Sequence, residues 1–122
     1  MKFSARICAF AALLSVVAIG LAFAPAHAET TATSTITQVQ VLEPSDKQYE
    51  LYHGVLWLDY DKSRFNYRWG GSHCAQQGLS DVNLSMIFDA FRAQHKVTIR
   101  YKNRLHEGTT YRCVTGFVIA RN

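Results

Sequence analysis

Histidines and cysteines are the side chains of this sequence best suited to metal or covalent chemistry, but their spacing favours neither. Four histidines follow residue 28, each in a different stretch of the chain: His53, His73, His95 and His106. None of them forms a His-x-x-x-His pair or stands at ligand spacing from a carboxylate, the pattern typical of a zinc site. His73 and Cys74 are neighbours and could act as base and nucleophile only if Cys74 were a free thiol.

Asp59 and Asp61 are two residues apart, so their carboxylates would share a face on an extended strand. Such a pair could bind a cation or act in acid–base chemistry, although a solvated turn accounts for it more simply. The sequence therefore predicts no enzyme, no metal site and no cofactor.

The first 28 residues have the three parts of a secretory signal peptide. Lys2 and Arg6 give a positive start, an apolar run follows over residues 7–23, and residues 26–28 (Ala-His-Ala) offer a cleavage site. A membrane anchor is the alternative, because the apolar run approaches the length of a spanning helix. Cleavage after residue 28 would remove Cys8 and leave 94 of the 122 residues, enough for one domain without a transmembrane segment.

Cys74 and Cys113 are predicted to form a disulfide, because small exported domains commonly pair an even number of cysteines. Closing a loop of about 39 residues would contribute ~4 kcal/mol in the chain-entropy model. A reactive thiol is the alternative, but neither cysteine lies in a Cys-x-x-Cys motif at a helix start.

Charge is unevenly distributed along the chain. The net charge of +4 falls to +2 without Lys2 and Arg6, yet residues 92–122 contain a single acid, Glu107. Seven basic residues share that stretch: Arg92, Lys96, Arg100, Lys102, Arg104, Arg112 and Arg121. A patch facing an anionic partner would explain this asymmetry, and so would two strands with solvated outer faces. The nearly neutral total and the expected export both argue against nucleic acid as the partner.

Periodicity divides the rest of the chain into five strands and one helix. The predicted strands are residues 36–42, 49–60, 64–69, 97–102 and 111–121. Ser80 is a suitable N-cap for a helix that ends near His95, because an apolar stripe repeats at helical spacing. That stripe consists of Leu84, Ile87, Phe88 and Phe91. Residues 29–35 are expected to be a flexible terminus and residues 103–109 a polar loop.

Three strands, a helix and two strands are the element order of the five-stranded OB barrel. Barrel closure would also hide the edges that a short five-stranded sheet exposes. The sequence therefore predicts a β-rich α+β fold with an OB-like barrel over residues 36–122. An open antiparallel sheet with one packed helix is the alternative.

An OB barrel binds ligands on the face of its second and third strands and in the adjoining loops. Aromatic and basic residues would line this face: Tyr49, Tyr52, Trp57, Arg64, Tyr67, Arg68, Trp69, Lys102, Arg104 and His106. Aromatic rings stack on sugars or bases, and basic side chains bind carboxylates or phosphates. About half of the aromatic residues must fill the core instead, because a barrel interior is packed with side chains. The candidate ligand-binding residues are Tyr52, Trp57, Arg68, Trp69, Lys102, Arg104 and His106.

A helix leads directly into a strand between Leu79 and Ile99, with one cysteine before it and another in the last strand. The junction reads Leu79-Ser80-Asp81, Asn83-Leu84, Met86-Ile87-Phe88, Ala90-Phe91 and His95-Lys96-Val97. In this it resembles the B subunits of bacterial AB5 toxins of the pertussis and subtilase cytotoxin type. By element order the likeness extends over residues 36–121. It implies a ring-forming OB-fold protein that binds cell-surface glycans, often sialylated, and it assigns no ligand residue.

These patterns together predict an exported, non-enzymatic module, periplasmic or secreted, that recognises a cell-surface glycan or another anionic ligand and could form a homo-oligomer. The alternative is an envelope protein-interaction, inhibitor or structural module that binds no small ligand.

Overall fold

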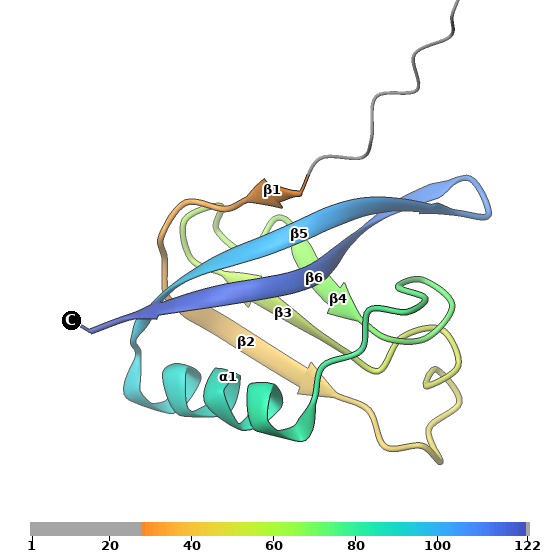
Figure 1. Ribbon diagram of the computed structural model, residues 1–122, viewed down its shortest axis with the longest axis horizontal. Coiled ribbons are helices and arrows are strands. Elements are labelled where there is room, and N and C mark those ends of the chain that lie inside the picture. Colours follow the sequence, from red (N-terminus) through yellow and green to blue (C-terminus); the bar gives the residue numbers. More distant parts are fainter. Residues whose placement is uncertain (1–27, 122) are drawn as a thin grey trace, which may run out of the picture.

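The computed structural model describes residues 28–121, which form a six-stranded sheet and one helix (Figure 1). The strands are β1 (Glu29–Thr30), β2 (Ile36–Val41), β3 (Gly54–Leu58), β4 (Asn66–Trp69), β5 (Lys96–His106) and β6 (Thr109–Ala120), and the helix is α1 (Asp81–Ala93). The expected signal peptide, residues 1–28, lies outside the described residues except for Ala28.

The sheet is open and mixed, with the strand order β1-β5-β6-β4-β3-β2. All neighbours are antiparallel except β4 and β6, which run parallel and pair where Arg68 stands opposite Cys113. The predicted closed five-stranded barrel is therefore wrong, and the sheet with one helix is the correct coarse description. Closure would need β2 to pair along β5, whereas a single bridge between Ser34 and Val97 joins these parts of the chain.

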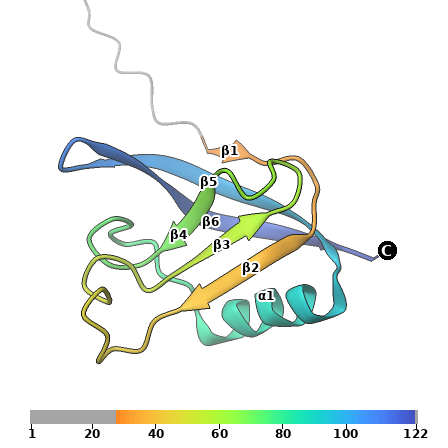
Figure 2. The same ribbon diagram turned by 180° about the vertical axis from the view of Figure 1, so that it is seen from behind.

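The inner face of the sheet packs on α1, which lies alongside β2 (Figures 1 and 2). As predicted, Ser80 caps the helix, since its hydroxyl accepts a hydrogen bond from the Asn83 amide at 3.2 Å. Ile87 and Ala90 are buried against the sheet. The other buried residues of this core come from the strands: Ile36, Leu56, Leu58, Tyr67, Trp69, Val97, Ile99, Tyr101 and Val114.

The segment over residues 29–35, expected to be flexible, follows the edge of β5 instead. The amide of Thr31 donates to the Ile99 carbonyl at 2.9 Å, and the Thr31 hydroxyl accepts from the Ile99 amide at 3.0 Å. Thr31 and Ser34 are buried. The composition of the segment does not indicate this pairing, which depends on the unpaired backbone groups of a long neighbouring strand.

Strands β5 and β6 form a long hairpin where a polar loop over residues 103–109 was expected (Figure 1). Glu107 and Gly108 both have positive φ, 48° and 81°, and form the two-residue turn. Such a turn matches the twist of the flanking strands, so pairing continues to its ends. This extension keeps Arg104 and His106 on a strand, opposite Tyr111 and Thr109.

The strand expected over residues 49–60 is shorter, because only Gly54–Leu58 pairs in the sheet. At Gly54, where the strand starts, a Cβ atom would collide with the Trp69 indole. The residues before it turn back across the outer face of the sheet. There they cover a second small apolar cluster of Leu42, Tyr52 and Val55.

Candidate functional site

The outer face of the sheet, on the side opposite the α1 core, brings several predicted site residues together. Val55, Arg68, Cys113 and Lys102 stand directly opposite one another across β3, β4, β6 and β5. In the adjoining row, Trp57 is opposite Asn66 and Arg104 is opposite Tyr111. Directly opposed residues project from the same face, so this face carries Trp57 and three cations from two separate parts of the chain.

Arg68 is at the centre of an aromatic cluster on this face. Its guanidinium carbon lies 4.6 Å from the centroid of the Tyr52 ring and 4.8 Å from that of the Tyr111 ring. Its Nη1 atom lies 2.6 Å from His73 Nδ1, and its Nε donates to Asn66 Oδ1 at 3.3 Å. Cation–π contacts and hydrogen bonds therefore hold the guanidinium group in one position. We call Arg68, Tyr52, His73, Tyr111 and His106 the Arg68 cluster.

His73 is fixed by its surroundings. Its ring stacks on Tyr111 with centroids 3.9 Å apart and lies 5.4 Å from the His106 ring. Its amide donates to the Leu51 carbonyl at 2.9 Å. Burial and, after it, the positive charge of Arg68 lower the pKa of His73 below its usual 6.5. His73 is therefore a neutral hydrogen-bond acceptor for Arg68 near neutral pH.

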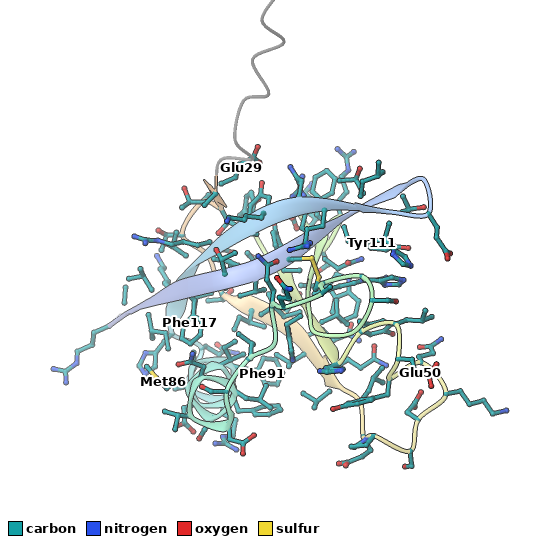
Figure 3. All side chains as sticks on the ribbon, turned by 45° about the vertical axis from the view of Figure 1, so that its right-hand side comes forward. Glu29, Glu50, Met86, Phe91, Tyr111 and Phe117 are labelled. Carbon is teal, nitrogen blue, oxygen red and sulfur yellow. A yellow bond between two sulfur atoms is a disulfide. The ribbon has the colours of Figure 1, made fainter. Side chains whose placement is uncertain are left out.

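The predicted disulfide is confirmed and supports this cluster. Cys74 and Cys113 are bonded, with Cα atoms 5.5 Å apart (Figure 3). The bond ties the segment that carries His73 to the centre of β6, two residues from Tyr111. Because Cys74 is in the disulfide, it is not available as a nucleophile for a His73 base.

The three cations of this face, Arg68, Lys102 and Arg104, form no ion pair with a carboxylate of the described residues. Residues 28–121 contain two ion pairs, Arg92 with Asp89 and His106 with Glu107. Arg68 therefore uses aromatic rings, an imidazole and an amide as partners, none of which carries a negative charge. A half-buried guanidinium in such a setting can still bind an anion, since some of its N–H donors remain available.

Of the predicted ligand residues, Tyr52, Trp57, Arg68, Lys102, Arg104 and His106 belong to this face or to the loop that covers it. Trp69 does not, because it is 2% exposed and packs in the core with Tyr67. A buried indole cannot stack on a ligand, which removes Trp69 from the candidate site. Tyr52 is itself 9% exposed, and its ring packs on one side of the Arg68 guanidinium.

Two members of the Arg68 cluster, His73 and Tyr111, were not among the predicted ligand residues. The sequence indicates Tyr111 only as the start of a strand, and it offers His73 only as a possible metal ligand or as a base beside Cys74. The disulfide offered one usable signal, because it requires the segment around residue 74 to lie over the last strand. Figure 3 shows Tyr111 on the side of the β5–β6 hairpin, away from Met86 on α1.

Other chemistry has less support among the described residues. No three His, Cys, Asp or Glu side chains in residues 28–121 gather where they could hold a metal ion. Asp59 and Asp61 lie in the turn between β3 and β4, as the simpler interpretation of this pair predicts, but only Asp59 is solvated. Both carboxylate oxygens of Asp61 are buried and have no hydrogen-bond partner. Over the same range, no helix combines the length and hydropathy needed to cross a membrane.

Comparison with family models, curated proteins and solved structures finds no match to this chain.

Proposed function

We propose that this protein is an exported, non-enzymatic module that binds an acidic glycan, or a related anionic ligand, on the outer face of its sheet. The observation that carries the proposal is Arg68, held between two tyrosine rings with no carboxylate partner. Arginine recognises carboxylate, sulfate and phosphate groups through its planar set of N–H donors.

The surroundings of Arg68 fit a ligand that has both an acidic group and an apolar ring face. Trp57 is half-buried on the same face, and Tyr111 stacks against His73 at its centre. Exposed edges and faces of such rings are suited to the apolar faces of sugars. Lys102 and Arg104 extend the positive charge toward the end of the β5–β6 hairpin. The resemblance of the helix–strand junction to toxin B subunits favours the same class of ligand.

Binding to a panel of carboxylated, sulfated and neutral glycans tests this proposal, with Arg68→Gln beside the wild type. We expect the wild type to retain acidic glycans and not their neutral counterparts, and Arg68→Gln to weaken that binding by about tenfold, as loss of a charge-assisted hydrogen bond implies. Arg121→Gln is the matched control, because it removes the same charge from the exposed chain beyond the far end of β6. Retention of neutral glycans alone, or equal loss in both variants, would count against the proposal.

A further inference from the structure

Strands β4 and β6 separate toward their starting ends and leave a groove. They are parallel and pair at Arg68 and Cys113, so the residues before these positions lie on the two sides of the gap. The groove has a volume of about 280 Å³. Its walls are Arg64, Phe65, Asn66 and Arg68 on one side and Thr109, Thr110, Tyr111 and Arg112 on the other.

The Arg112 side chain lines this groove, and three aromatic rings surround its guanidinium group. Its guanidinium carbon lies 4.0 Å from the centroid of the Phe65 ring, 5.1 Å from that of Tyr101 and 5.7 Å from that of Tyr67. Its Nη1 donates to the Tyr67 hydroxyl at 3.2 Å. Burial raises the pKa of Tyr67 above its usual 10, so this hydroxyl stays neutral. The rings hold the guanidinium in place without neutralising its charge.

Three arginines line this groove, which has no acidic residue in its walls. Arg68 lines it from the outer face, with Tyr111, and Arg112 lines it from the opposite side of the sheet, with Tyr67 and Tyr101. None of Arg64, Arg68 and Arg112 is in either ion pair of the described residues. A groove that is lined by arginines without carboxylate partners is suited to an anion. The neutral polar groups of the walls, from Asn66, Thr109 and Thr110, could bind the uncharged parts of such a ligand.

We infer that the β4–β6 groove holds the acidic group of the ligand, an oxyanion such as a carboxylate, sulfate or phosphate, and that Arg112 is its anchor. This inference rests on the proposed function and goes further, because it assigns the acidic group to one binding position. The groove is at the small end of ligand pockets, which begin at about 300 Å³, so it takes one sugar ring or a smaller acid. A longer glycan would continue from there over Tyr111 and Arg68 onto the outer face.

Nuclear magnetic resonance of the 15N-labelled protein tests the inference, because backbone amides and arginine Nε–H groups report binding separately. Inorganic sulfate, inorganic phosphate and glucuronate are titrated in turn, with glucose as the uncharged match for glucuronate. We expect saturable shifts at Arg112, Arg64 and Thr110 with the anions and none with glucose. The anion that binds most tightly identifies the acidic group.

Two variants make the result specific. Arg112→Gln should weaken binding about tenfold, and Arg64→Gln should weaken it by a smaller factor. Arg64 is exposed and its side chain supports nothing else, so its variant remains informative if Arg112→Gln unfolds. Arg121→Gln should bind as the wild type does. Shifts confined to Lys102 and Arg104, with unchanged affinity in the Arg112 and Arg64 variants, would overturn the inference and leave the proposed function standing. No shift with any anion, and no retention of acidic glycans, would overturn both.

Discussion

The Nη1 atom of Arg68 lies 2.6 Å from the Nδ1 atom of His73. A guanidinium group has only donors, so Nδ1 must be the acceptor and the imidazole must be neutral, with its proton on Nε2. Protonation of His73 would replace this hydrogen bond by repulsion between two cations. The contact therefore makes both the stability and the ligand binding of the protein depend on pH.

Stability should fall as the pH drops below about 6.5. The pKa of His73 is lower in the folded than in the unfolded protein, so over this range the unfolded chain binds more protons. Neutral His73 makes its full contribution to the free energy of unfolding when the pH is above the pKa of this histidine in the unfolded chain. That contribution is lost as the pH falls toward the lower pKa of His73 in the folded protein. Urea unfolding between about pH 5 and pH 8 measures it, with His73→Asn as the control, because the amide oxygen replaces the acceptor and does not titrate. If the free energy of unfolding changed equally with pH in the wild type and in His73→Asn, the prediction would be contradicted.

Affinity for an anion should rise as the pH falls through the same range. A negative charge beside Arg68 offsets one of the causes that lower the pKa of His73, the positive charge of Arg68, so binding takes up protons. Calorimetry at about pH 6 in two buffers of different ionisation enthalpy measures this uptake. His73→Asn should abolish it and His106→Asn should leave most of it. Proton release on binding would show that the anion does not sit near His73.

Removal of the disulfide should cost about 4 kcal/mol of unfolding free energy, because it closes a loop with a sequence separation of 39. Replacement of Cys74 and Cys113 by alanine, followed by urea unfolding, gives the value, and the reduced wild type should match the double variant. The Arg68–His73 contact should weaken as well, since the bond holds the segment that carries His73. An unchanged unfolding midpoint would mean that the bond adds nothing to the fold.

Export of the full chain should yield a product that starts at Glu29. A cut after Ala28 would leave β1 intact, including the hydrogen bond of 2.9 Å from the Tyr101 hydroxyl to Glu29 Oε2. Mass spectrometry of the protein from the periplasm or medium of a bacterial host checks the cleavage site. Ala28→Lys should block processing, because the site requires small residues. A wild-type chain that retains residue 1 would contradict the expected signal peptide.

Local patterns were sufficient for the helix and the disulfide. Ser80, followed by apolar residues at helical spacing, predicts α1 to within a few residues of its end, because capping and burial of one face act within a single segment. Cys74 and Cys113 left only one pairing once Cys8 was set aside.

The site could not be predicted in the same way. Period two shows that Tyr67 and Trp69 share a face, but only the sheet order and the position of α1 decide that this face is the inner one. The Arg68 cluster draws on three separate parts of the chain, and no local pattern relates Tyr52 to Tyr111. Arg112 was counted only as one of seven basic residues, since the aromatic rings around it come from β4, β5 and the turn before β4.

The most direct test of anionic ligand recognition is the affinity of the purified protein for one acidic glycan and for the same glycan with its carboxylate methylated. Both ligands present the same sugar rings, so the comparison isolates the charge. The structure predicts that methylation weakens binding by at least about tenfold, since it removes a charge-assisted contact with arginine. Equal affinity for the two forms would contradict the account, because arginines without carboxylate partners would then have no part in recognition.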